Sequence, residues 1–302
     1  MLALLAAAAL TPTLAGCAVF PADNAWNRRV DQLPVAPGSA RLIRSIGLDA
    51  HFHADFGSGR WDGGPIGIPY TVVGGDQRRV SVTFDYADES DRGPYPIPPN
   101  APIEGGRNAD GDRHVLIVDR SACRLYELFD AHPLAGGRAW HAGSGAIFDL
   151  RSNRLRPKTW TSADAAGLPI LPGLARYPEV AQGAIRHALR FTAPRTRTSF
   201  VWPARHQAGA SGDAALPPMG LRVRLKRSTS LRGLPRQARI IATTMKRYGL
   251  MLADNGSPWY VSGAPDRRWD NDQLHALDRL SGRDFEVVDA RPLRAQATTQ
   301  GP

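Results

Sequence analysis

Lysine is nearly absent from this chain, because only Lys158, Lys226 and Lys246 occur among 302 residues. The formal net charge of +10 therefore comes almost entirely from arginine. The arginines are scattered rather than clustered, which argues against a nucleic-acid-binding surface. A basic exported protein suits an anionic partner such as a uronate polymer. We expect a polysaccharide partner, neutral or anionic, and no nucleic acid.

Long apolar runs are also missing. No segment holds 18 consecutive apolar residues, which argues against an integral membrane protein. The first 15 residues form a shorter apolar stretch that ends in small residues, as in a secretory signal peptide. They lack the usual basic start, because no lysine or arginine precedes Arg28. We expect residues 1–15 to be a signal peptide and the protein to be secreted or periplasmic.

Cysteine is scarce, with only Cys17 and Cys123 in the chain. An even count in an exported protein favours a disulfide between them. The letters LAGC at 14–17 also resemble a lipobox, in which an acylated Cys17 would anchor the protein to a membrane. We predict the disulfide and keep the lipid anchor as the alternative.

The common catalytic signatures are absent: the chain has no nucleophile elbow, HExxH motif, CxxC pair or Walker loop. Serine hydrolases, zinc peptidases and nucleotide-binding proteins are therefore disfavoured, and we expect no cofactor. His51, His53 and Asp55 alternate in spacing, as in some metal sites, but the pattern is short and common. Asn108, Asp110 and Asp112 also occur at alternate positions, which fits a solvated turn better than a calcium-binding loop. We assign no metal.

The composition is that of a folded protein, with 42% hydrophobic and 22% charged residues. Alternating apolar residues predict about ten short strands, and 3.6-residue periodicity predicts two or three helices, at 39–46 with Ser39 as N-cap and again after Pro235. Strands at 67–73 and 79–86 are joined by a four-residue turn, and 250–262 predicts a second strand pair around Asn255-Gly256. We predict one β-sandwich or jelly-roll-like domain over 16–290, with long ordered loops and a polar tail at 291–302.

A hairpin at 114–129 carries the main catalytic candidates. Its second strand, from Cys123 to Phe129, places Glu127 on an otherwise apolar face, where an unpaired carboxylate is costly. A turn at 119–122 would place Glu127 roughly opposite His114, and a buried Glu beside a His can hold a proton near neutral pH. The structural alternative is that Arg124, Arg138 or a backbone group satisfies Glu127.

Further candidates surround this hairpin or lie in loops. Two carboxylates that flank a sugar bond suffice for its hydrolysis, so Glu104 and Asp112 are the acid or base partners of Glu127. His187 and Arg190 lie on one predicted strand, where His187 is either a core residue or a catalytic group. Aromatic rings in loops stack on sugars or close the ends of a sandwich. The predicted substrate-binding residues are Trp160, Asp164, Trp259, Asp254 and Arg222.

Seven segments, among them HADFGS, ESDRGPYPIP, GDRHVLIVD, WTSADAAGLPILPGL and ADNGSPWYVSGAPDRRWD, resemble a group of uncharacterised secreted proteins of bacteria and fungi. The resemblance covers nearly all of the expected mature chain. It implies export and a single domain, and it assigns no activity to any residue.

The sequence thus predicts a secreted carbohydrate-active enzyme, a polysaccharide hydrolase that uses Glu127 with Asp112 or Glu104, assisted by His114 and His187. One alternative is a uronate lyase, in which Arg190 or Arg222 neutralises the carboxylate and His187 or Tyr126 abstracts the proton. The other is a glycan-binding or cell-surface module without catalysis.

Overall fold

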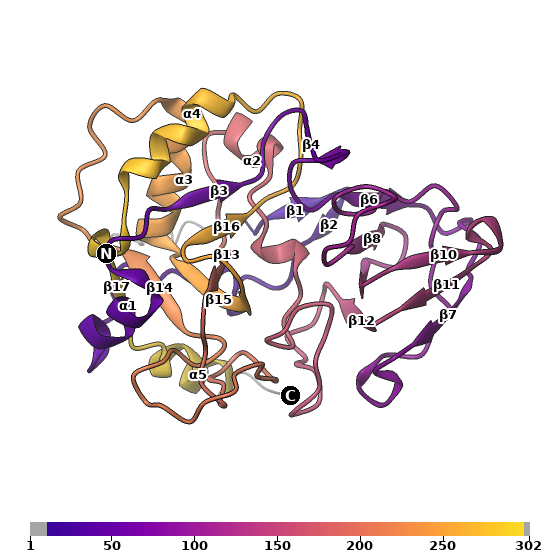
Figure 1. Cartoon of the computed structure of the whole chain (residues 1–302), viewed down its shortest axis with the longest axis horizontal. Helices are drawn as coiled ribbons and strands as arrows, with labels where there is room; N and C mark the ends of the chain where they lie inside the picture. The colour runs from indigo at the N-terminus through magenta and orange to yellow at the C-terminus, as the bar shows by residue number, and fades with distance from the viewer. Residues whose placement is uncertain (1–10, 299–302) are drawn as a thin grey trace, which may run out of the picture.

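A computed structural model describes residues 11–298, so most of the expected signal peptide, residues 1–10, lies outside the described residues. Strands hold 27% of the chain and helices 18%, which confirms a mainly β protein. The strands fall into several sheets rather than two packed layers, and helices flank one of these sheets (Figure 1). A sandwich or jelly roll is not confirmed.

The largest sheet has six strands and lies at the left in Figure 1. Its order is β17 (Phe285–Val287), β14 (Arg222–Leu225), β15 (Leu250–Asn255), β13 (Leu189–Ala193), β16 (Tyr260–Ser262) and β3 (His53–Asp55). The β13–β15 and β16–β3 pairs are parallel, and the other pairs are antiparallel.

The other half of the molecule contains two smaller sheets. One has the order β12 (Ser144–Asp149), β9 (Arg124–Phe129), β8 (Val115–Asp119) and β6 (Tyr70–Val73). The other has the order β10 (His132–Leu134), β11 (Ala139–Ala142) and β7 (Ser81–Phe84). Two short hairpins add β1 (Thr13–Leu14) with β2 (Cys17–Ala18), and β4 (Arg60–Trp61) with β5 (Gly64–Pro65).

Helices accompany the six-stranded sheet. They are α1 (Ser39–Gly47), α2 (Tyr177–Ala181), α3 (Arg236–Arg247), α4 (Asn271–His275) and α5 (Arg291–Thr298). Single 3-10 turns occur at Ala87–Glu89, Ala135–Gly137, Leu171–Gly173, Ala276–Arg279 and Gly282–Asp284. Along residues 11–298, no helix is both long and apolar enough to span a membrane.

Both main predicted helices form, although one cap differs. α3 buries Ala238, Ile241 and Met245 along the predicted face. α1 has Gly38 rather than Ser39 at its N-cap, so that expectation is wrong. The Ser39 hydroxyl instead accepts a 2.8 Å hydrogen bond from the Val287 amide, which fastens α1 to β17.

Several strands form where predicted but pair differently. β6 and β7 do not form a hairpin, because β6 joins β8 and β7 joins β11, each in parallel. β15 and β16 are likewise separated by β13. Periodicity indicates which face of a strand is buried, but it is the same for every partner and so does not choose one. The β8–β9 hairpin forms as expected.

Two large apolar clusters organise the described residues. The smaller one lies between the three- and four-stranded sheets and includes Ile117, Tyr126 and Trp140. The larger one joins the opposite face of the four-stranded sheet, through Leu116 and Leu125, to the six-stranded sheet and α3. The long connection predicted at 154–180 is ordered, and its Ile170, Leu171 and Leu174 are fully buried in the larger cluster.

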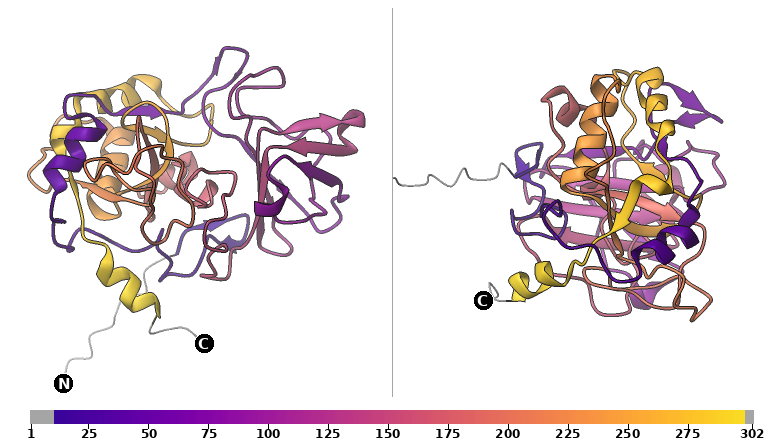
Figure 2. Two further views of the ribbon diagram at one scale, coloured as in Figure 1. Left: turned by 60° about the horizontal axis from the view of Figure 1, so that its bottom comes forward. Right: turned by 90° about the vertical axis from the view of Figure 1, so that its left-hand side faces the viewer.

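Both terminal segments of the described chain are attached to the rest of the protein, one by a disulfide and one by α5. Cys17 and Cys123 form the predicted disulfide, with Cα atoms 5.6 Å apart. β1 belongs to the expected signal segment, so cleavage after Ala15 would remove that strand. The expected polar tail forms α5, which projects at the edge of the body (Figure 2), and its Leu293 is buried against Val30 and Val288.

Candidate functional site

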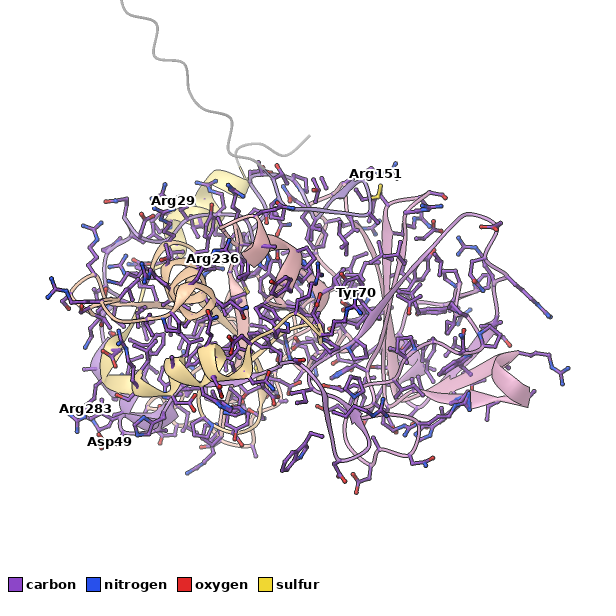
Figure 3. The ribbon with its side chains drawn as sticks, turned by 90° about the horizontal axis from the view of Figure 1, so that it is seen from above. Arg29, Asp49, Tyr70, Arg151, Arg236 and Arg283 are labelled. Atoms are coloured by element: carbon purple, nitrogen blue, oxygen red, sulfur yellow. A yellow bond between two sulfur atoms is a disulfide. The ribbon has the colours of Figure 1, made fainter. Side chains whose placement is uncertain are left out.

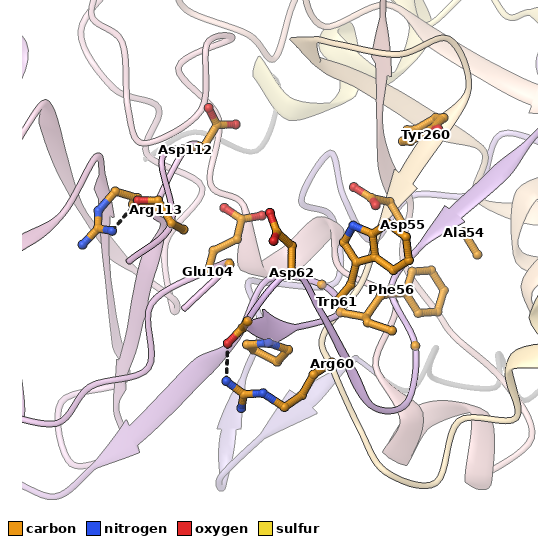
Figure 4. A pocket seen from close by; sticks show the side chains of 18 of the residues that line it. Ala54, Asp55, Phe56, Arg60, Trp61, Asp62, Glu104, Asp112, Arg113 and Tyr260 are labelled. Atoms are coloured by element: carbon orange, nitrogen blue, oxygen red, sulfur yellow. Dashed lines mark hydrogen bonds between the residues drawn. The ribbon is translucent and has the colours of Figure 1, made fainter. Parts of the chain in front are cut away.

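A groove of about 1220 Å³ opens where the two halves of the molecule meet. Its walls come from β3 and the following loop (53–67), from the segment 104–113, and from the start of α4 with Tyr260 of β16. In the close view of Figure 4, the side chains of Asp55 and Asp112 lie on opposite sides of the groove, with Glu104 and Trp61 between them.

Two glycines bring the β4–β5 hairpin against the segment that carries Glu104. A Cβ atom on Gly64 would lie 2.1 Å from the carbonyl carbon of Gly105, so only glycine permits this contact. The close contact holds the neighbouring Trp61 at the groove, although 79% of the tryptophan remains exposed. An exposed ring beside several carboxylates is typical of a surface on which a sugar stacks.

Glu104 and His114 form a short ion pair at the wall of the groove. The His114 Nδ1 atom lies 2.5 Å from Glu104 Oε2, and Nε2 lies 2.9 Å from the Ala163 carbonyl oxygen. Both ring nitrogens face acceptors, so the ring carries two protons. Burial alone would lower the pKa of His114, but the charge of Glu104 raises it to about 9. Burial likewise opposes ionisation of Glu104, yet His114 outweighs it and lowers the pKa of that carboxyl.

Arg190 of β13 anchors a buried polar layer behind the groove. Its Nε donates to Asp164 Oδ2 at 3.2 Å and its Nη1 to Ser262 Oγ at 2.7 Å, while Nη2 lies 3.7 Å from Asp254 Oδ2. Burial raises the pKa of both aspartates, and Arg190 only partly offsets this effect. Two carboxyl groups thus share one guanidinium and retain a proton more readily than isolated aspartates.

Asp55 and Asp112 complete the groove. Asp55 ends β3 opposite Ser262 of β16, and β16 is the strand between Asp55 and Arg190 of β13. The Asp55 side chain is exposed at the groove, where the surrounding protein partly desolvates its carboxyl and raises its pKa. The charge of Glu104 adds to this rise, whereas His53 opposes it. Asp112 is exposed and acts electrostatically on Arg190, His114 and Asp254, so it lies at the same site.

Glu127 is satisfied by the backbone, as in the structural alternative. Its Oε1 accepts from the amides of Ile170 and Leu171 at 3.0 and 2.9 Å, and Oε2 accepts from Ile170 at 2.8 Å. The residue opposite Glu127 is Leu116, not His114, so the predicted register is wrong by two residues. Burial raises the pKa of Glu127 to about 7 despite these amides. Glu127 therefore positions the 170–171 turn and is closed off from the groove.

Replacing Glu127 with glutamine should leave activity per folded molecule unchanged and alter the pH dependence of stability. The folded state binds this proton up to about pH 7 and the unfolded state only to about 4.5, so wild-type stability falls as pH rises through that window. Relative to the variant, we expect the wild type to lose roughly 3 kcal/mol between pH 4.5 and 8, measured by urea unfolding. A difference that does not change with pH would contradict this assignment.

Two predicted residues lie away from the groove. His187 is buried between the Ala188 carbonyl, at 2.8 Å, and Glu179 Oε2, at 3.1 Å, so it is the core histidine of the structural alternative. Arg222 donates only to backbone carbonyls, among them Tyr248 O at 2.6 Å. The expectation that these two residues join Arg190 around a substrate is wrong, because His187 precedes β13 and bonds to Glu179, whereas Arg222 lies on β14, which β15 separates from β13.

The predicted aromatic contacts also differ. Trp259 is fully buried between Phe191 and Phe285, with ring centroids 5.5 and 4.7 Å away, so its expected exposure is wrong. Trp160 is half-buried beside the Arg156 guanidinium and does not line the groove. Tyr126 is buried in the smaller cluster and accepts a hydrogen bond from Arg79. A loop position does not by itself expose a ring, because loops here pack into the core.

The segment around His51 does not build a metal site. His51 bonds to the Asp278 carbonyl at 2.7 Å, whereas His53 packs on the Tyr260 ring with centroids 4.3 Å apart. Across residues 11–298, no three His, Cys, Asp or Glu side chains are placed to hold a metal ion.

The structure therefore brings together Glu104, Asp112, His114, Arg190, Asp164 and Asp254 from the predicted set. Sequence reasoning missed Asp55 and Trp61 as parts of this site. Asp55 stood out only through its spacing to two histidines, and Trp61 was one aromatic among several in loops. The chain matches no protein-family model, no curated protein and no solved structure.

Proposed function

We propose that the protein is a carbohydrate-active hydrolase that cleaves a polysaccharide lying in the groove. The observation that carries the proposal is that two carboxyl groups, on Asp55 and Glu104, line one groove beside the exposed ring of Trp61. Their pKa values are shifted in opposite directions. His114 lowers the pKa of Glu104, and partial desolvation at the groove raises that of Asp55. Such a divergence is how a site assigns one carboxyl to base or nucleophile and the other to acid.

In this proposal Asp55 protonates the leaving oxygen, while ionised Glu104 activates water or attacks the sugar carbon. His114 does not exchange protons, since both its nitrogens are committed to acceptors. It is a positioning residue that keeps Glu104 charged. Asp112 lines the groove, and together with Asp164 and Asp254 it interacts with the charge of Arg190 behind it.

The charge of the groove favours a neutral or amine-bearing sugar over a uronate. Five acidic side chains line it against three arginines, and one of those, Arg113, is buried with hydrogen bonds to carbonyl oxygens. Among the groove acids within residues 11–298, only Glu104 has an ion-pair partner. The lyase alternative named Arg190 or Arg222 to neutralise the carboxylate and His187 or Tyr126 as the base, and none of Arg222, His187 and Tyr126 lines the groove.

The experiment is to incubate the protein with neutral, amino-sugar and uronate polysaccharides and to follow new reducing ends together with the absorbance of unsaturated uronates. New ends without absorbance support hydrolysis, whereas both signals together support a lyase. Retention on a polysaccharide affinity gel without any cleavage supports a glycan-binding module instead.

Replacing Trp61 with alanine should lower kcat/KM on the cleaved polymer about tenfold, mainly through KM, because a stacking surface is lost without touching either carboxyl. Initial rates against substrate concentration measure this effect. Tyr86→Ala is the matched control, since Tyr86 is an exposed aromatic, at 55%, outside the groove. Equal rates for the two variants would remove Trp61 from substrate binding.

We also propose that the protein is exported, as the N-terminal pattern predicts. The Cys17–Cys123 disulfide supports this proposal, because such bonds persist mainly in oxidising compartments. Sequencing the mature N-terminus tests it and locates the cleavage relative to β1.

A further inference from the structure

A second cavity, of about 540 Å³, shares no residue with the groove. Its wall is formed by residues 197–205, 218–222 and 287–294, together with Leu42 and Lys158. Its volume lies in the range of small-molecule sites. Nothing in the proposed hydrolysis uses it.

The cavity is strongly basic. Six cationic side chains line it against a single carboxylate, Asp289, which is already bonded to Arg291 through Nε at 2.9 Å. The cationic side chains are Lys158, Arg197, Arg205, Arg222, Arg291 and Arg294. By contrast, the arginines labelled in Figure 3, such as Arg29, Arg151 and Arg283, lie on separate parts of the surface.

Four of these cations lack a carboxylate partner in the part of the chain that the structure describes. Arg197 donates to Ser199 Oγ at 2.9 Å and Arg205 to the Arg156 carbonyl at 2.8 Å, and Lys158 is exposed. Arg222 is 4% exposed and donates only to the carbonyls of other residues, so it is a buried charge without a counterion. Buried charges are normally paired, because isolation from water is costly.

The rest of the wall is apolar. Half-buried Phe200 and Trp202 line it together with Leu221, Val287 and Val288. A small inorganic anion would satisfy the cations and leave this surface uncovered. An apolar chain alone would leave the cations unpaired.

We propose that this cavity binds a single-chain amphiphile with a phosphate or carboxylate head. The head lies at Arg197, Arg205 and Lys158, which lack carboxylate partners among the described residues, while the chain covers Trp202 and its apolar neighbours. Arginine suits such a head because its planar fork binds both kinds of oxyanion through paired hydrogen bonds.

Titration calorimetry of the full chain with decyl phosphate, kept below its micelle concentration, tests the proposal. We expect one molecule to bind, with Arg205→Gln and Lys158→Gln each weakening it several-fold to tenfold and the double variant more. Lys158 is exposed and forms no hydrogen bond or ion pair within residues 11–298, so its replacement should not disturb the fold. Decyl maltoside, with a neutral head, and inorganic phosphate, without a chain, should both bind far more weakly.

Arg138→Gln is the matched control, because Arg138 is an exposed arginine outside the cavity. It should bind decyl phosphate as the wild type does. The proposal is overturned if no saturable binding occurs, if decyl maltoside binds equally well, or if the control and cavity variants lose the same affinity. The proposal is also overturned if the protein binds phosphatidylglycerol vesicles but does not bind monomeric decyl phosphate. These outcomes do not depend on hydrolysis, which the groove variants report separately.

Discussion

Replacing Glu104 with glutamine is expected to lower kcat on the cleaved polysaccharide by about a thousandfold while the fold is retained. Glutamine keeps the shape of the side chain but has no charge to activate water or to attack a sugar. Its carbonyl oxygen can still accept from His114 Nδ1, which lies 2.5 Å from Glu104 Oε2, so the wall of the groove stays in place. Initial rates with far-ultraviolet circular dichroism measure both consequences.

Asp85→Asn is the matched control for Glu104→Gln. Asp85 also pairs with a histidine, His141, at 3.3 Å, but it is exposed and outside the groove, so its loss should leave the rate unchanged. The pH profile adds a second readout. Wild-type rates should fall at low pH as Glu104 gains a proton and at high pH as Asp55 loses one. A folded Glu104→Gln protein with full activity would rule out the proposed mechanism.

Removal of the disulfide, by Cys17→Ala with Cys123→Ser, is expected to lower the free energy of unfolding by about 4 kcal/mol. The bond closes a loop of 106 residues, so the unfolded chain gains considerable conformational freedom without it. In the folded state the same bond fastens the β1–β2 hairpin to the turn before β9. Urea unfolding of the wild type and the double variant gives the difference.

Dithiothreitol supplies the control for this stability change. Reduction should destabilise the wild type by a similar amount and leave the double variant unaffected. Equal stability of the oxidised wild type and the double variant would contradict the structural role of the bond. Mass spectrometry of the mature protein checks the pairing directly, since an acylated Cys17 cannot form it.

The candidate site shows what pattern reasoning finds and what it misses. The period of two correctly placed Glu127 on the face that packs on the larger cluster, and the need for a partner followed from its burial. The partner itself is a pair of amides at Ile170 and Leu171, more than forty residues away. No local sequence pattern links these positions, because every residue except proline has a backbone N–H and the sequence does not show which one will donate.

Asp55 and Trp61 were missed for the opposite reason. Their residue types are visible in the sequence, but their roles come from what surrounds them. Asp55 becomes an acid candidate because β3 pairs with β16 and places it in reach of Glu104 and Arg190. Trp61 faces the groove because Gly64 contacts Gly105.

The sequence by itself determined the mainly β class, the helices near 39 and 236, the Cys17–Cys123 pair and the ordered long connection within 154–180, since each follows from composition, local periodicity or a count of two. Only the tertiary structure decided which strands pair, which aromatic rings reach solvent and which of the many acids meet. Strand pairing depends on the packing of whole sheets, and the charge state of a carboxyl depends on neighbours within a few ångströms that are distant in the chain. These three-dimensional relations turn Glu104 into an ionised carboxylate and leave Arg222 without a countercharge.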